Sequence, residues 1–76
     1  MNIETFTKLF AEQFDYSDHV NFQSNTEFKQ LDEWSSLMSL IIIMMIKDNY
    51  NTTISGEDIK NANIIEDLYK IVLSQQ

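Results

Sequence analysis

Apolar side chains recur at helical spacing over the first fourteen residues of the chain. They lie three or four positions apart, at Ile3, Phe6, Leu9, Phe10 and Phe14. This spacing places them along one face of a helix. Asn2 precedes the segment, and its side chain is of a type that caps helix N-termini. The pattern predicts an amphipathic helix that begins at residue 3 and ends near residue 14.

Residues 15–35 have no long helical period and are rich in the Asp, Ser, Asn and Thr side chains that favour turns. We expect a long loop here, with one short turn from Glu27 to Leu31 and with His19 exposed to solvent. Its apolar residues would anchor it to the domain: Tyr16, Val20, Phe22, Phe28, Leu31 and Trp34. So long a loop is uncommon in a small domain and usually has a function.

The longest apolar run extends from Leu37 to Ile46 and is interrupted by a single serine. Ser35 and Ser36 precede it, and a serine before an apolar segment indicates a helix start. Three consecutive isoleucines also suit a buried strand. The length of the segment and the lack of a partner strand in the sequence favour a helix, which we expect from Ser36 to Asn49.

The orientation of this helix has two interpretations. In the first, Met38, Ile41 and Met45 point outward, because the opposite side supplies the core residues Ser39, Ile42, Ile43, Ile46 and Tyr50. An exposed stripe that contains methionine is a suitable surface for a protein partner. In the second, some of the three outward residues pack beneath the long loop.

The segment Ser55-Gly56-Glu57-Asp58 has the spacing of a capping box, with Asp at its last position. It predicts a short helix from Gly56 to about Asn61. Asn63 is the expected cap of a last helix, which would extend to about Leu73. The predicted fold class is therefore all-α: a small bundle of three main helices and one short helix, in a single domain that spans residues 1–76.

Composition excludes several functions. The chain has 76 residues, with 12 carboxylates, five lysines, no arginine, one histidine, no cysteine and a formal net charge of −7. Without cysteine there is no disulfide, thiol nucleophile or Cys-based zinc site, and one histidine is too few for the usual metal site. The acidity argues against nucleic acid and anionic membranes as partners. We therefore expect no metal and no nucleic-acid partner.

The location follows from two further features. The longest apolar run is half of the ~20 residues that a membrane span requires. The N-terminus has no basic region that leads into an apolar stretch, as a secretory signal does. We expect a cytoplasmic monomer without membrane insertion. No catalytic set is apparent either, since a charged loop explains the adjacent Asp32 and Glu33 better than a general acid/base pair does.

From Phe28 to Leu37 the sequence Phe-Lys-Gln-Leu-Asp-Glu-Trp-Ser-Ser-Leu resembles the approach to the modified serine of acyl carrier proteins. That family attaches 4′-phosphopantetheine to the serine of an Asp-Ser-Leu motif at the start of its second helix. Discrete bacterial members often have Leu-Asp-Glu-Trp-Asp-Ser-Leu there. The resemblance continues through residues 46–54, 56–59 and 65–69 with matching lengths between landmarks, so it covers most of the chain. Ser36 matches the modified serine.

The resemblance implies a carrier rather than an enzyme. Coenzyme A would supply the covalent 4′-phosphopantetheine, whose thiol would hold an acyl or aminoacyl group on a chain that has no thiol of its own. The implied partners are a phosphopantetheinyl transferase, an acyl-loading ligase or acyltransferase, and an acyl-consuming synthase or transferase of a lipid or specialised biosynthetic pathway. The phosphodiester would also be an anion at the positive end of a helix.

Two positions depart from the family pattern. Ser35 stands where Asp is usual, and Asp48 is the one acid in a helix that is more acidic in many members. Docking contacts are expected from Trp34, Ser35, Leu37, Met38, Ile41 and Asp48, although an anchor for the loop is the favoured interpretation of Trp34. The alternative function is an unmodified acidic helical adaptor or inhibitor that binds a basic protein, and the missing Asp at position 35 is its argument.

Overall fold

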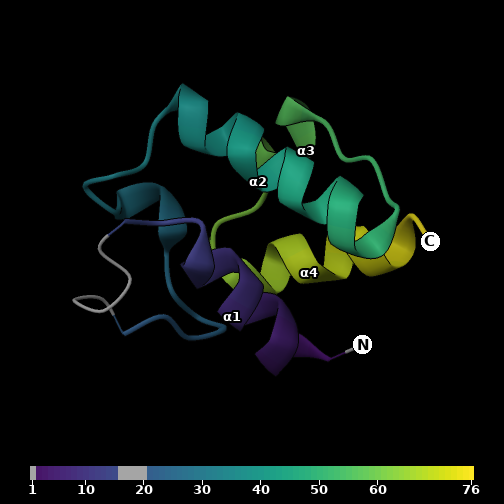
Figure 1. The fold of residues 1–76 in the computed structure, drawn as a ribbon, viewed down its shortest axis with the longest axis horizontal. Helices are drawn as coiled ribbons and strands as arrows, with labels where there is room; N and C mark the ends of the chain where they lie inside the picture. Colours follow the sequence, from purple (N-terminus) through teal and green to yellow (C-terminus); the bar gives the residue numbers. More distant parts are fainter. Residues whose placement is uncertain (1, 16–20) are drawn as a thin grey trace.

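The computed structural model describes residues 2–15 and 21–76, and the secondary structure in these two ranges is entirely helical (Figure 1). The elements follow one another as α1 (Ile3–Glu12), the 3₁₀ turn η2 (Phe28–Gln30), α2 (Ser36–Tyr50), α3 (Gly56–Asn61) and α4 (Ile65–Ser74). The prediction of three main helices and one short helix is confirmed. Tyr16, His19 and Val20 lie outside the described residues, so the predictions for them stay predictions.

The helices enclose one apolar core. Helix α1 packs against α2 and α4, and the short α3 packs against the same two helices. In Figure 1, α2 crosses one side of the molecule, while α1 and α4 lie on the other. Each element contributes to the core, whose fully buried large side chains are Phe6, Phe10, Phe28, Ile42, Ile46, Ile65, Leu68 and Val72.

Side chains that precede α1 and α3 cap the N-termini of these two helices, as predicted. The Oδ1 atom of Asn2 accepts the N–H of Thr5 at 2.8 Å at the start of α1. At α3, Ser55 Oγ accepts the N–H of Asp58 at 3.1 Å, and the Asp58 carboxylate accepts the N–H of Ser55 at 2.9 Å. These contacts satisfy N–H groups that have no partner within the helix. Asp therefore completes the capping box in place of the more common Glu or Gln.

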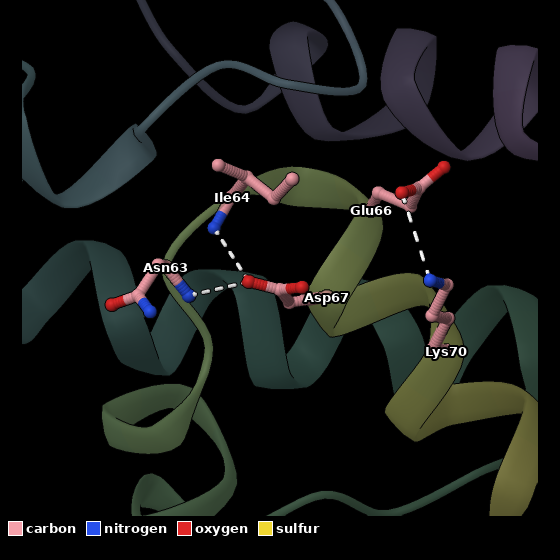
Figure 2. A network of polar contacts seen from close by, with 5 residues as sticks. All are labelled: Asn63, Ile64, Glu66, Asp67 and Lys70. Atoms are coloured by element: carbon pink, nitrogen blue, oxygen red, sulfur yellow. Dashed lines mark hydrogen bonds and ion pairs between the residues drawn. The ribbon is translucent and has the colours of Figure 1, made fainter.

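Helix α4 begins differently, and the prediction of an Asn63 cap is wrong. Asp67 Oδ2 accepts the backbone N–H groups of Asn63 and Ile64 at 3.0 and 3.1 Å, beside an ion pair of 3.7 Å between Glu66 and Lys70 (Figure 2). These N–H donors hold the pKa of the Asp67 carboxyl below its ordinary value, because they favour the charged form. The helix is therefore fixed by a carboxylate from its own first turn.

The long loop completes the start of α4. The carbonyl oxygens of Thr26 and Ser24 accept the N–H groups of Ile65 and Glu66 at 3.2 and 2.8 Å. From η2, the ammonium group of Lys29 donates to the carbonyl oxygen of Lys60 at 2.9 Å, at the C-terminal end of α3. The loop therefore binds both sides of the α3–α4 connection. Its anchors within the described residues are confirmed, since Phe22, Phe28, Leu31 and Trp34 are buried in the core or packed against it.

The structure corrects the predicted orientation of α2. Met38 and Met45 are only 8% and 4% exposed, so the expectation that they point outward is wrong, and both belong to the core. Helix α2 is apolar around most of its circumference, and such a pattern does not reveal which side faces inward. The inward side carries Met38, Ile42, Met45 and Ile46. A smaller difference is that α1 ends at Glu12 rather than near Phe14.

Candidate functional site

The candidate site is the start of α2. Ser35 has an extended backbone, and its Oγ accepts the N–H of Met38 at 3.2 Å. Its carbonyl oxygen accepts the N–H of Ser39 at 3.0 Å. Ser35 therefore caps the helix, as predicted. Ser36 follows as the first helical residue, and its side chain is exposed.

The electrostatic surroundings of the Ser36 hydroxyl suit an anion. Ser36 lies at the N-terminus of a fifteen-residue helix, where the aligned peptide dipoles produce partial positive charge. The first turn of α2 contains no acidic residue that would oppose an anion. The leading N–H groups of a helix are also hydrogen-bond donors that no carbonyl of the same helix can satisfy. An ester of phosphoric acid on this hydroxyl would therefore lie in a favourable field.

The turn before the site is held by Trp34. The backbone N–H of Trp34 donates to the carbonyl oxygen of Leu31 at 2.9 Å, which closes the turn. Its ring meets Phe28 edge-on, with 5.0 Å between centroids, and stacks on Phe14 at 6.4 Å. Aromatic pairs at such distances add to the gain from burial. The interpretation of Trp34 as an anchor of the loop is confirmed.

A hydrogen bond connects the turn before Ser36 to the residues that follow α1. The Oε1 atom of Glu33 accepts the N–H of Asp15 at 3.1 Å, just beyond the end of α1. The neighbouring Asp32 is exposed. The two adjacent carboxylates therefore lie in a turn that is fastened at Glu33 and at Trp34, close in sequence to Ser36. These two hydrogen bonds position the turn just before the exposed hydroxyl.

The structure brings only some of the predicted docking residues together. Trp34, Ser35 and Leu37 adjoin Ser36, and Leu37 is 65% exposed. Met38 is buried, so the expectation that it forms a docking surface is wrong, and Ile41 is half-buried. Asp48 is exposed but lies on the last turn of α2, roughly 18 Å along the axis from Ser36 at 1.5 Å per residue.

The structure exposes two apolar side chains that the sequence pattern does not single out. Leu40 is 58% exposed and Met44 is 63% exposed. With Leu37 they have the spacing i, i+3 and i+7, which is the signal that identifies one helix face. Met44 also lines a surface groove of about 310 Å³ that lies between α2 and the end of α1. The lining residues of this groove are Gln13, Ile41, Met44, Met45, Asp48 and Asn49.

Other parts of the described chain carry less chemistry. No three or more His, Cys, Asp or Glu residues among those described could together hold a metal ion. In the same residues, no helix has the length and apolar character needed to cross a membrane. The hydroxyl of Tyr50 is buried without a hydrogen-bond partner in the described ranges, and burial, followed by the proximity of Tyr69, raises its pKa.

Comparison of the sequence with protein-family models finds no match. Comparisons with curated proteins and with solved structures find none either.

Proposed function

We propose that this protein is an acyl carrier protein, which holds an acyl or aminoacyl group as a thioester on 4′-phosphopantetheine attached to Ser36. The observation that carries the proposal is the placement of Ser36 as an exposed hydroxyl at the first position of α2, directly after a capping residue. The chain order of three longer helices with a short α3 before the last of them is the arrangement implied by the resemblance to that family.

The residues at the start of α2 fit the proposed group. The hydroxyl is exposed, the first turn has no acid, and the helix N-terminus favours a phosphodiester. In the transfer, Ser36 Oγ forms a bond to the β-phosphorus of coenzyme A, the diphosphate bond breaks, and the adenosine bisphosphate part leaves. A base of the transferase accepts the hydroxyl proton. The bound group supplies the thiol that this chain lacks.

The proposed role needs no catalytic residue from this chain. Its own residues position the attachment point, and partner enzymes perform the reactions. The proposed partners are a phosphopantetheinyl transferase, an acyl-loading ligase or acyltransferase, and an acyl-consuming synthase or transferase in the cytoplasm. The net charge of −7 supports encounters with enzymes that have basic surfaces, because opposite charges accelerate association.

The test is incubation of the full chain with coenzyme A and a broad-specificity phosphopantetheinyl transferase, followed by measurement of the intact mass. We expect a gain of one phosphopantetheinyl group. Ser36→Ala should abolish the gain, while Ser35→Ala should retain it, because Ser35 caps the helix and is not the proposed acceptor. A known carrier protein serves as the positive control for the transferase.

Two outcomes would overturn the proposal as far as this transferase is concerned. In one, the wild-type chain gains no mass while the control carrier is modified. In the other, Ser36→Ala is modified as well as the wild type. The first would favour the unmodified adaptor as the function of the chain.

A further inference from the structure

A surface groove of about 460 Å³ lies between one face of α1 and residues 22–24 of the long loop. No residue of α2 lines this groove, and α1 lies on the side of the molecule opposite α2 in Figure 1. The groove is therefore separate from Ser36. Its volume is within the range of pockets that hold small ligands, which is roughly 300–1,000 Å³.

Hydrogen bonds fix the loop side of the groove. The backbone N–H of Gln23 donates to Thr26 Oγ1 at 2.8 Å, and the carbonyl oxygen of Gln23 accepts the N–H of Thr26 at 3.0 Å. The carbonyl oxygen of Ser24 accepts the N–H of Glu66 at 2.8 Å, which holds the loop against the start of α4. Because this side is formed before any ligand arrives, binding requires little ordering of the loop.

The apolar surface of the groove comes from both sides. Ile3 and Ala11 contribute to it on α1, and Phe22 contributes to it on the loop. All three residues are half-buried, so part of each side chain is open to a ligand. The Phe22 ring is anchored to the core by Phe14 and Phe10, with centroids 5.2 and 6.3 Å apart. The groove therefore favours a ligand with an apolar body.

Two opposite charges line the same groove without pairing. Glu4 and Lys8 are exposed and lie four residues apart on α1, a spacing at which such side chains can form an ion pair. In the ranges that the structure describes, the ion pair joins Glu66 to Lys70, and neither Glu4 nor Lys8 has a side-chain hydrogen bond or ion pair. Both charged groups are therefore available to a ligand.

These two charges select among the possible ligands. A simple anion would be attracted by Lys8 and repelled by Glu4, and a simple cation would meet the reverse. An uncharged apolar molecule would leave both charges unused. A second copy of this chain would bring its own net charge of −7, so repulsion opposes it. A ligand with an ammonium group at one end and a carboxylate at the other is complementary to both residues.

We propose that the groove binds a short peptide with free termini, about two residues long and with apolar side chains. Its ammonium group would face Glu4 and its carboxylate would face Lys8, while its side chains would cover Ile3, Ala11 and Phe22. The rise along α1 from Glu4 to Lys8 is about 6 Å at 1.5 Å per residue. Two extended residues span roughly 7 Å, so both ends of such a peptide can meet their partners at once.

The test is a titration of the isotopically labelled full chain with the dipeptide Leu-Leu, followed by NMR chemical shifts. We expect saturable shifts at α1 and at residues 22–24, with a dissociation constant of about 1 mM or below, as for a small ligand in an open groove. N-acetyl-Leu-Leu lacks the ammonium group, and Leu-Leu amide lacks the carboxylate. Each should bind about twofold to fivefold more weakly, which is the range for an exposed ion pair.

Charge variants assign each end of the dipeptide. Glu4→Gln should weaken binding of Leu-Leu by about twofold to fivefold and should not weaken N-acetyl-Leu-Leu, which has no ammonium group to lose. Lys8→Gln should act in the same way on Leu-Leu but not on Leu-Leu amide. The matched control is Glu12→Gln, which removes an exposed carboxylate of α1 outside the groove and should leave the affinity unchanged.

A steric variant locates the binding independently of charge. Ala11→Leu keeps a good helix former in α1 but fills the groove, so it should weaken binding of Leu-Leu by about tenfold or more. The matched control is Thr5→Leu, which adds a leucine to α1 at an exposed position outside the groove. Circular dichroism should show a folded chain in both variants.

Several results would overturn the inference. They are no saturable shift up to about 10 mM Leu-Leu, equal affinity for both capped dipeptides, or unchanged affinity in Ala11→Leu. Ser36→Ala should bind Leu-Leu as the wild type does, because Ser36 does not line the groove. Failure here therefore leaves the carrier proposal standing, and failure of the carrier proposal leaves this inference standing.

Discussion

The two adjacent serines at the start of α2 differ in their contacts. The Ser35 hydroxyl accepts the N–H of Met38 and caps the helix, while the Ser36 side chain is exposed. Serine and aspartate are comparable N-caps. Compared with the Asp-Ser-Leu motif that residues 35–37 resemble, Ser35 retains the helix start and lacks a negative charge next to the proposed acceptor.

Substitutions at these two serines should distinguish the capping residue Ser35 from the exposed Ser36 by their effects on stability. Ser35→Ala should lower the free energy of unfolding by about 1 kcal/mol, because a capping bond is lost. Ser36→Ala should change it by less than about 0.5 kcal/mol, since the side chain is exposed. Ser35→Asp should retain stability and, if the transferase recognises the family's acid, increase the rate of modification. Urea denaturation measures the first two effects, and equal losses for both alanine variants would contradict the assignment of Ser35 as the cap.

The Tyr50 hydroxyl is an opposite case, a polar group that is buried and makes no hydrogen bond to the described residues. Such a group bears the cost of leaving water without a compensating bond. Tyr50→Phe should therefore leave the free energy of unfolding unchanged or raise it. Thermal unfolding measures this, and a loss of more than about 1 kcal/mol would show that the hydroxyl contributes a stabilising contact.

At the level of elements, the helix starts differ in how their N–H groups are satisfied. Helices α1, α2 and α3 use a side chain that lies just before them, at Asn2, Ser35 and Ser55. Helix α4 uses Asp67 from its own first turn and the loop carbonyl oxygens of Ser24 and Thr26. The long loop therefore stabilises the fold directly as well as connecting α1 to α2.

The pH dependence of stability should reveal the role of Asp67. The N–H groups of Asn63 and Ile64 lower its pKa from the ordinary value of 3.8, so the folded chain favours the carboxylate. A depressed pKa contributes stability that is present above the ordinary value and is lost as pH falls through it toward the folded pKa. Asp67→Asn should therefore be less stable than wild type at pH 7, by about 1 kcal/mol as for other caps, and the difference should shrink below about pH 4.

The control for that measurement is Asp32→Asn, which removes a negative charge from the exposed turn before α2. Its denaturation midpoint should remain close to that of wild type across the same pH range. A difference between Asp67→Asn and wild type that stays constant down to pH 3 would contradict the assignment of the carboxylate as the acceptor of these two N–H groups.

Local signals made most of the elements predictable. Caps and spacing lie within a few residues of each helix start, so the starts of α2 and α3 follow from Ser35 and Ser55. The loop contacts to Ile65 and Glu66 join residues far apart in sequence, and no local pattern reports them. The inward side of α2 also depends on tertiary packing, because its composition is nearly uniform around the helix. For that reason Met38 was expected outside, and Leu40 and Met44 were missed.

On the scale of the whole molecule, the chain combines a net charge of −7, an exposed hydroxyl at one end of α2 and the exposed apolar side chains of Leu37, Leu40 and Met44 along the same helix. A chain of 76 residues has a small core, and most of its large aromatic side chains are used to fill it and to hold the loop. The exposed hydroxyl of Ser36 and most of the exposed large apolar side chains of the described residues lie on α2. The proposed carrier role would use the charge, because opposite charges on partner enzymes accelerate encounters.

The central claim is that Ser36 carries a phosphopantetheinyl group, and it is tested most directly with the transferase of the cells in which the protein is naturally made. The full chain and Ser36→Ala are incubated with that transferase and coenzyme A, and the intact mass and the site of modification are determined by mass spectrometry. The predicted result is one added phosphopantetheinyl group, located on Ser36 and absent from Ser36→Ala. An unmodified wild-type chain, in a reaction where the same transferase modifies another carrier, would contradict the claim.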